Sequence, residues 1–231
     1  MQRAPLLLAA VTALALTSCS GDDSEPVSTD RSPEEVMELA KTTLDETSGV
    51  SISLSTDDLP EDVTGVVDAS GVGTPAPAFE GDITVILLGN SVEVPVVAVD
   101  DVVYAELPLT SGFQEVDPAE YGAPDPAQLM STEEGFSSVL PETTDLEEGD
   151  TVRGGADNSE VLTEYAGIVP DTVVKNVIPS ASGDFDVTYT ITAEGELREA
   201  VLTGVFYPDS AEMTYTIGFD DYGTEQDITA P

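Results

Sequence analysis

The chain has 231 residues, 40% of them hydrophobic, and its 46 Asp and Glu against 6 Lys and Arg give a formal net charge of −40 at pH 7. A field of that sign repels phosphate backbones and anionic lipid headgroups, so nucleic acid is not an expected partner. The sequence has no histidine and one cysteine, which excludes Ser-His-Asp, Cys-His and zinc-histidine sites, so we expect no enzyme and no cofactor.

Residues 1–18 have the pattern of an export signal. Arg3 supplies a short positive end, and the uncharged apolar run Leu6–Leu16 follows it. That run is too short for a membrane-spanning helix, which needs roughly 20 residues. It leads into the letters "LTSC", an aliphatic residue and two small residues before Cys19, which resembles the bacterial lipobox.

The lipobox resemblance implies that the Cys19 thiol receives a diacylglycerol and that the chain is cut before it. Two acyl chains suffice for stable anchoring, here at the outer face of the cytoplasmic membrane. The alternative is an ordinary secretory signal with an incidental cysteine, which would leave an unpaired thiol in an oxidising compartment. Residues 19–31, rich in Ser, Asp, Glu and Pro, are expected to form a flexible acidic tether.

The folded part, residues 32–231, is expected to begin with an amphipathic helix. Ser32 is a candidate N-cap, a proline suits the first helical position, and Glu35 completes a capping box. The period then changes to two at residues 50–55, where Val, Ile and Leu alternate with Ser as in a half-buried strand. A second, weaker strand is predicted within residues 62–73.

The strongest strand pattern follows, with strands predicted near residues 82–88, 92–99 and 102–107. Two turn signals, Gly89-Asn90 and Asp100-Asp101, separate them. The first of these strands is apolar on both faces, whereas a sheet with one face in water alternates cleanly. Two interpretations remain open. Either helices cover the second face of the sheet and the core is solid, which periodicity alone favours, or one face of these strands lines an apolar cavity.

The rest of the chain changes pattern twice. Residues 108–141 carry several prolines and short helical pieces, "PAEYG" and "STEEGFSSVL". Strands are predicted at residues 144–153 and 158–166, followed by a short helix, "TVVKNVI", that Asp171 would cap. A three-stranded antiparallel meander is predicted within residues 185–219. No linker suggests a domain boundary, so a single α+β domain is predicted.

This order of elements resembles the mycobacterial LppX/LprA/LprF/LprG lipoprotein family of actinobacteria over nearly the whole mature chain. The most telling piece is Asp100-Asp101 followed by Val103-Tyr104-Ala105, where the family has Asp-Gly and then apolar-Tyr-Ala. A second is the chain end, where Tyr222-Gly223 precedes an expected terminal strand at Asp227-Ile228-Thr229.

The resemblance implies a strongly curved antiparallel sheet, a half-barrel, with helices on its concave side and an apolar cavity between them. In that family the cavity holds acyl chains of lipids such as phosphatidylinositol mannosides, lipoarabinomannan-type glycolipids, triacylglycerols or phthiocerol esters, carried towards the outer envelope. The implied partners are an acylated lipid or glycolipid, the cytoplasmic membrane through Cys19, and a membrane lipid transporter. Ile83 aligns with an aliphatic residue lining the family's cavity, and Val85 and Leu87 share its face, so these three are candidate ligand-lining residues.

The chain departs from the family in its acidity, because six basic residues leave no basic rim for anionic headgroups. Acyl chains can still dominate affinity, since each buried CH2 is worth about 0.8 kcal/mol. The alternative function is a membrane-anchored structural or accessory envelope protein without a ligand. The acidic stretch "FDDYGTEQD" lacks the spacing of an EF-hand, so no metal site is predicted.

Overall fold

The computed structural model describes residues 31–231 except 62, 88, 122 and 156–157, so the export signal and Cys19 lie outside the described residues. Helices and strands follow one another as α1 (Pro33–Glu46), β1 (Val50–Ser55), β2 (Gly65–Thr74), β3 (Ala78–Leu87), β4 (Asn90–Val99), β5 (Val102–Ala105), β6 (Gln114–Val116), η1 (Pro118–Tyr121), η2 (Gln128–Met130), η3 (Phe136–Glu142), β7 (Thr144–Gly154), β8 (Glu160–Val169), α2 (Asp171–Val177), β9 (Ser182–Thr192), β10 (Leu197–Val205) and β11 (Met213–Asp220).

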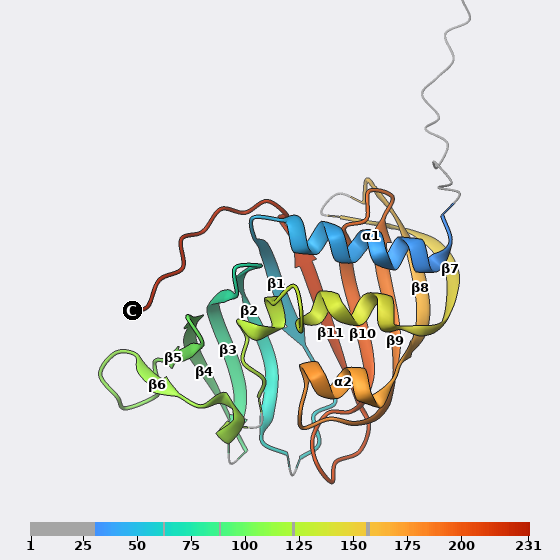
Figure 1. Cartoon of the computed structure of the whole chain (residues 1–231). Coiled ribbons are helices and arrows are strands. Elements are labelled where there is room, and N and C mark those ends of the chain that lie inside the picture. The colour runs from blue at the N-terminus through green and yellow to red at the C-terminus, as the bar shows by residue number, and fades with distance from the viewer. Residues whose placement is uncertain (1–30, 62, 88, 122, 156–157) are drawn as a thin grey trace, which may run out of the picture.

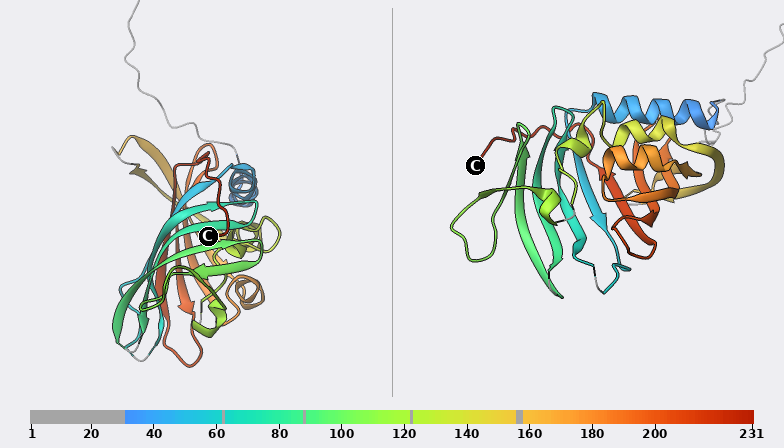
Figure 2. Two further views of the ribbon diagram at one scale, coloured as in Figure 1. Left: turned by 90° about the vertical axis from the view of Figure 1, so that its left-hand side faces the viewer. Right: turned by 60° about the horizontal axis from the view of Figure 1, so that its bottom comes forward.

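The eleven strands of the described residues form one antiparallel sheet in the order β6-β5-β4-β3-β2-β1-β11-β10-β9-β8-β7. The chain runs outward from β1 to β6, and the last five strands fill the other half, so β1 and β11 pair at the centre. The sheet is strongly curved and does not close, because β6 and β7 are left as edges (Figure 2). The predicted half-barrel with helices on its concave side is therefore confirmed.

Helices α1, η3 and α2 lie one below another across the half of the sheet formed by β8 to β11 (Figure 1). α1 begins as predicted, with the Ser32 hydroxyl accepting from the Glu35 amide at 3.3 Å and the Glu35 carboxylate accepting from the Ser32 amide at 2.8 Å. Its buried face packs on η3, and polar contacts fix that packing. Ser137 donates to Asp45 at 2.6 Å, and Lys41 donates to the Thr132 carbonyl at 2.8 Å.

The helical layer and this half of the sheet bury one large apolar core. Its largest fully buried side chains are Tyr189, Phe185, Phe219, Met37 and Leu140. The Tyr189 hydroxyl shares a 3.0 Å hydrogen bond with that of Thr143, so the one polar group of this ring is satisfied. Burial raises the pKa of Tyr189, and the ring therefore stays neutral.

Strands β3 and β4 are covered on their concave face and, at one end, on their convex face. Asp82 and Glu93 of the convex face stay exposed. On the concave side Phe79, Val94 and their neighbours pack with Ala127, which precedes η2. On the convex side Ile228 of the C-terminal segment packs against Ala78 and Val97. The expected terminal strand at Asp227–Thr229 is wrong, because this segment forms no strand ladder and crosses the sheet as an extended strap.

Two local predictions, the turn at Asp100-Asp101 and the cap of α2, had different outcomes. Asp100 and Asp101 both have positive φ, 54° and 61°, and join β4 to β5 in the predicted tight turn. The predicted capping of α2 by Asp171 is wrong, because Pro170 occupies the N-cap position. Instead the Asp171 amide donates to the Asp184 carboxylate at 2.9 Å, so the cap comes from the next strand.

Candidate functional site

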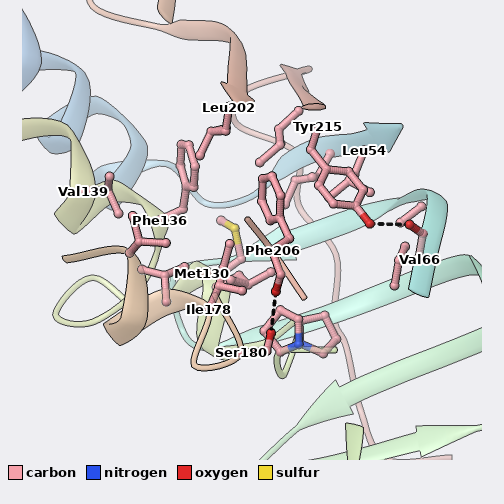
Figure 3. Close-up of a pocket in the computed structure, with 18 of the residues that line it drawn as sticks. Leu54, Val66, Met130, Phe136, Val139, Ile178, Ser180, Leu202, Phe206 and Tyr215 are labelled. Atoms are coloured by element: carbon pink, nitrogen blue, oxygen red, sulfur yellow. Dashed lines mark hydrogen bonds between the residues drawn. The ribbon is translucent and has the colours of Figure 1, made fainter. Parts of the chain in front are cut away.

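An apolar cavity of about 150 Å³ lies between the concave face of the sheet and the helical layer. Figure 3 shows its wall, which draws on both halves of the sheet and on the proline-rich middle of the chain. The sheet contributes Ile52, Leu54, Val66, Ala69, Phe79, Val169, Leu202, Tyr215, Ile217 and Phe219. The segments between strands contribute Pro124, Pro126, Leu129, Met130, Phe136, Val139, Val174, Val177, Ile178, Ser180, Phe206 and Tyr207.

Only three of these side chains carry a polar group, and each of the three is hydrogen bonded. Ser180 donates to the Phe206 carbonyl at 3.0 Å. The hydroxyls of Tyr207 and Tyr215 lie 2.8 Å apart, and Tyr215 donates to the Val66 carbonyl. Because their partners are already in the protein, the cavity offers an occupant a hydrocarbon-like surface.

Burial of Tyr215 raises the pKa of its phenol. The neighbouring Tyr207 hydroxyl and the Asp58 carboxylate act in the same direction, since both disfavour a phenolate. Tyr215 therefore stays protonated and remains a hydrogen-bond donor. The described residues that form the wall of the cavity accordingly include no ionised side chain.

The size of the cavity limits what fits without movement. A dry apolar cavity of about 150 Å³ accommodates a ligand the size of benzene, and a long acyl chain is several times larger. Occupancy by such a chain therefore requires the covering segments to move outward. The η2 segment, whose Leu129 and Met130 lie in the wall, is suited to movement, because it is a short 3-10 turn and the hydrogen-bond geometry of such turns is poorer than that of an α-helix.

A larger groove of about 800 Å³ adjoins the cavity. Pro124, Leu129, Val177 and Ser180 line both spaces, so the two meet at these residues. The groove lies between β5 and β6 on one side and η1, η2 and the end of α2 on the other. Its lining mixes apolar side chains with carboxylates, whereas the cavity behind it is almost wholly apolar.

The three predicted lining residues lie on β3, beside the cavity. Ile83 pairs with Ala69, and Val85 pairs with Val66, two residues that line the cavity from β2. Ile83 and Val85 are half-buried and Leu87, near the end of the strand, is 40% exposed. None of the three belongs to the wall itself in this structure, so their role as ligand-lining residues stays a prediction.

Most of the wall was not predicted from the sequence. The alternation in β1 and β11 identified half-buried strands without indicating that Ile52, Leu54 and Ile217 face a space. The letters "PDPAQLM" carried a usable signal, because Leu129 and Met130 are apolar residues in a proline-rich segment whose element, η2, is a single short 3-10 turn. That segment supplies part of the cavity's cover.

Other chemistry is not indicated by the described residues. They contain no group of three His, Cys, Asp or Glu side chains placed to hold a metal ion. Within the same residues, no helix is both long and apolar enough to span a bilayer.

Comparisons with known proteins agree with this architecture. The model of the family described as LppX_LprAFG lipoprotein matches residues 32–229. The crystal structure of LprF from Mycobacterium bovis superposes with a TM-score of 0.67 at 15% sequence identity, covering 86% of this chain and 96% of that one. LppX from Mycobacterium tuberculosis gives a TM-score of 0.61 at 14% identity, covering 87% and 100%. No curated protein matches the sequence.

Proposed function

The chain belongs to the LppX_LprAFG lipoprotein family, and on that premise we propose that it binds acylated lipids or glycolipids in its apolar cavity. In this proposal it carries them from the cytoplasmic membrane towards the outer envelope. The observation that carries the proposal is the cavity itself, in which every polar side-chain group of the wall already has a hydrogen-bond partner.

The physical basis is the transfer of hydrocarbon from water. Each CH2 group buried contributes about 0.8 kcal/mol, so a chain of a dozen or more carbons offsets a modest rearrangement of the cover. The η2 segment and the end of α2 are the parts that must yield, since they separate the cavity from the groove. The core beneath α1 and η3 is held by the Asp45–Ser137 and Thr143–Tyr189 hydrogen bonds and stays in place.

The proposal places the protein outside the cytoplasm, with Cys19 carrying a diacylglycerol that anchors it to the outer face of the cell membrane. Residues 19–31 would then be the tether and residues 32–231 the lipid-binding domain. This arrangement rests on the lipobox letters "LTSC" and on membership of a lipoprotein family. A membrane lipid transporter that loads the cavity is a further proposed partner.

The test is the lipid content of the purified protein. The non-acylated form starting at Ser20 is purified and analysed by native mass spectrometry, and an organic extract is separated by thin-layer chromatography. We expect a co-purified lipid of defined mass and a higher melting temperature on adding a diacyl lipid. A clean extract without stabilisation would instead favour the alternative, an anchored structural or accessory protein with no ligand.

A further inference from the structure

Five carboxylates line the groove that adjoins the apolar cavity. They come from the β4–β5 turn, from β6 and the residue after it, and from the segments on either side of η2. They are Asp101, Glu115, Asp117, Asp125 and Glu134. The groove and the cavity share four lining residues, so a lipid whose chain occupies the cavity has its headgroup beside these carboxylates.

Three of the five carboxylates are held in place by hydrogen bonds that use only one of their oxygens. Asp117 accepts from the Ala119 amide at 3.0 Å, and Asp125 accepts from the Ala127 amide at 2.8 Å. Asp101 accepts from Gln128 at 3.0 Å. No hydrogen bond from another described residue reaches their second oxygens, which can therefore accept from a ligand. Glu115 and Glu134 are exposed at the groove.

No positive charge lies among the described residues that line the groove, which include neither Lys nor Arg. Lys175, next to the groove residue Asn176, is paired with Asp171 at 2.7 Å. Lys41 is paired with Asp45, and Arg198 with Glu160 and Glu196, so these cations are committed elsewhere.

We propose that this groove selects lipids by their headgroup, taking headgroups that carry no net negative charge and donate hydrogen bonds from hydroxyl or amino groups. The inference rests on the proposed lipid-binding function, and it adds a specificity that the apolar cavity cannot supply. Carboxylate oxygens accept hydrogen bonds from such donors. They repel the phosphate of an anionic lipid, and the repulsion weakens as salt shortens the screening length.

The test compares three pyrene-labelled lipids with identical acyl chains and different headgroups. Phosphatidylglycerol is anionic, diglucosyl diacylglycerol offers hydroxyls, and a diacyl aminopropane offers an ammonium group. Each is delivered from cyclodextrin to the non-acylated protein starting at Ser20, so that no vesicle surface contributes. At about 50 mM NaCl, where the screening length exceeds about 10 Å, we expect phosphatidylglycerol to bind about tenfold or more weakly than the glucolipid. In 1 M NaCl the difference shrinks.

The groove variant is Asp101→Asn/Glu115→Gln/Asp117→Asn/Glu134→Gln, which keeps the capping acceptors but removes four charges. Its matched control is Asp82→Asn/Glu93→Gln/Asp186→Asn/Glu199→Gln, which removes four charges from exposed residues of the convex face. We expect the groove variant to lose most of the discrimination against phosphatidylglycerol and the control to keep it. The diacyl aminopropane distinguishes an ammonium donor from the hydroxyl donors of the glucolipid. Among the three lipids, only its affinity should fall as the NaCl concentration rises.

Three outcomes overturn the proposal. Equal binding of phosphatidylglycerol and glucolipid by the native protein refutes headgroup selection. Equal loss of discrimination in the groove variant and the control assigns the effect to the net charge and not to the groove. If none of the three lipids binds, while circular dichroism shows a folded protein, the lipid-binding function itself falls and takes this inference with it.

Discussion

The hydroxyl oxygens of Tyr207 and Tyr215 lie 2.8 Å apart at the edge of the apolar cavity, and together they close a ring of hydrogen bonds on the backbone of Val66. The Val66 amide donates to Tyr207 at 3.1 Å, and Tyr215 donates to the Val66 carbonyl. On β2, the pairing with β1 begins at Asp68. Val66 lies two residues before that point, next to a bulge in the pairing of β2 with β3. The two phenols therefore satisfy backbone groups that the sheet leaves unpaired.

Removing one of these hydroxyls is expected to destabilise the fold. Tyr215→Phe leaves the Val66 carbonyl without its partner, and a buried group left unsatisfied costs about 1–3 kcal/mol. Urea unfolding of the form starting at Ser20 measures the change. Tyr104→Phe is the control, since Tyr104 is partly buried outside the ring, and it should change stability by less than about 0.5 kcal/mol. Equal effects of the two substitutions would show that the ring contributes nothing.

The buried tyrosines predict a loss of stability in alkali. Burial raises the pKa of Tyr189, Tyr215 and Tyr222 in the folded protein, whereas an unfolded tyrosine ionises near pH 10. Below that pH both states are neutral and the free energy of unfolding is constant. Above it the unfolded chain loses protons first, so stability falls by up to about 1.4 kcal/mol per pH unit for each tyrosine.

Urea unfolding between pH 8 and pH 11.5 checks this dependence. Tyr222→Phe should make the decline above pH 10 shallower by one tyrosine's share, because one titrating group is removed. A stability that is flat to pH 11.5 would mean that these phenols ionise equally in both states, and a slope unchanged in Tyr222→Phe would mean this for Tyr222 alone.

The strands could be predicted from the sequence better than the cavity between the sheet and its covering segments. Alternation fixed β1 and the final meander, and the capping box fixed the start of α1, because each of these signals is local. The double-sided apolar pattern around Ile83 left both a solid core and a cavity open, with periodicity favouring the core, since the pattern shows that both faces are apolar but not what lies against them. On the concave face the cover comes from a contact distant in sequence, the cluster that includes Ala127, whereas Ile86 on the convex face is only half-buried.

The two local errors have the same cause. Asp171 looked like a helix cap, yet its own amide is capped by Asp184 from β9, because the turn between α2 and β9 brings that carboxylate back to the start of the helix. Asp227–Thr229 looked like a strand, yet the neighbouring strands β3 and β4 already pair with each other. In both places the structure is determined by contacts with another element and not by the local sequence pattern.

Ile83→Trp tests whether the cavity extends along β3 when a lipid is bound. Ile83 pairs with the wall residue Ala69, so an indole there should occupy space that an acyl chain needs. We expect lipid occupancy, measured by native mass spectrometry, to fall several-fold while the circular dichroism spectrum is kept. Ile86→Trp, on the opposite face of the same strand, is the control and should leave occupancy unchanged. Unchanged occupancy in Ile83→Trp would remove this residue from the lipid site.

The strap that ends the chain covers an apolar patch at one end of the convex face of β3 and β4, and its packing can be tested at one residue. Ile228 is 9% exposed and covers Ala78 and Val97, and Gln226 donates to Glu80 at 2.7 Å. Ile228→Ser uncovers this apolar surface and should lower the free energy of unfolding by about 1.5–3 kcal/mol, the value of burying such a side chain. Thr229→Ser, at an exposed neighbour, should be neutral in the same urea titration. Matching stabilities for Ile228→Ser and the native protein would mean that the strap does not pack in solution, and that another partner covers Val97.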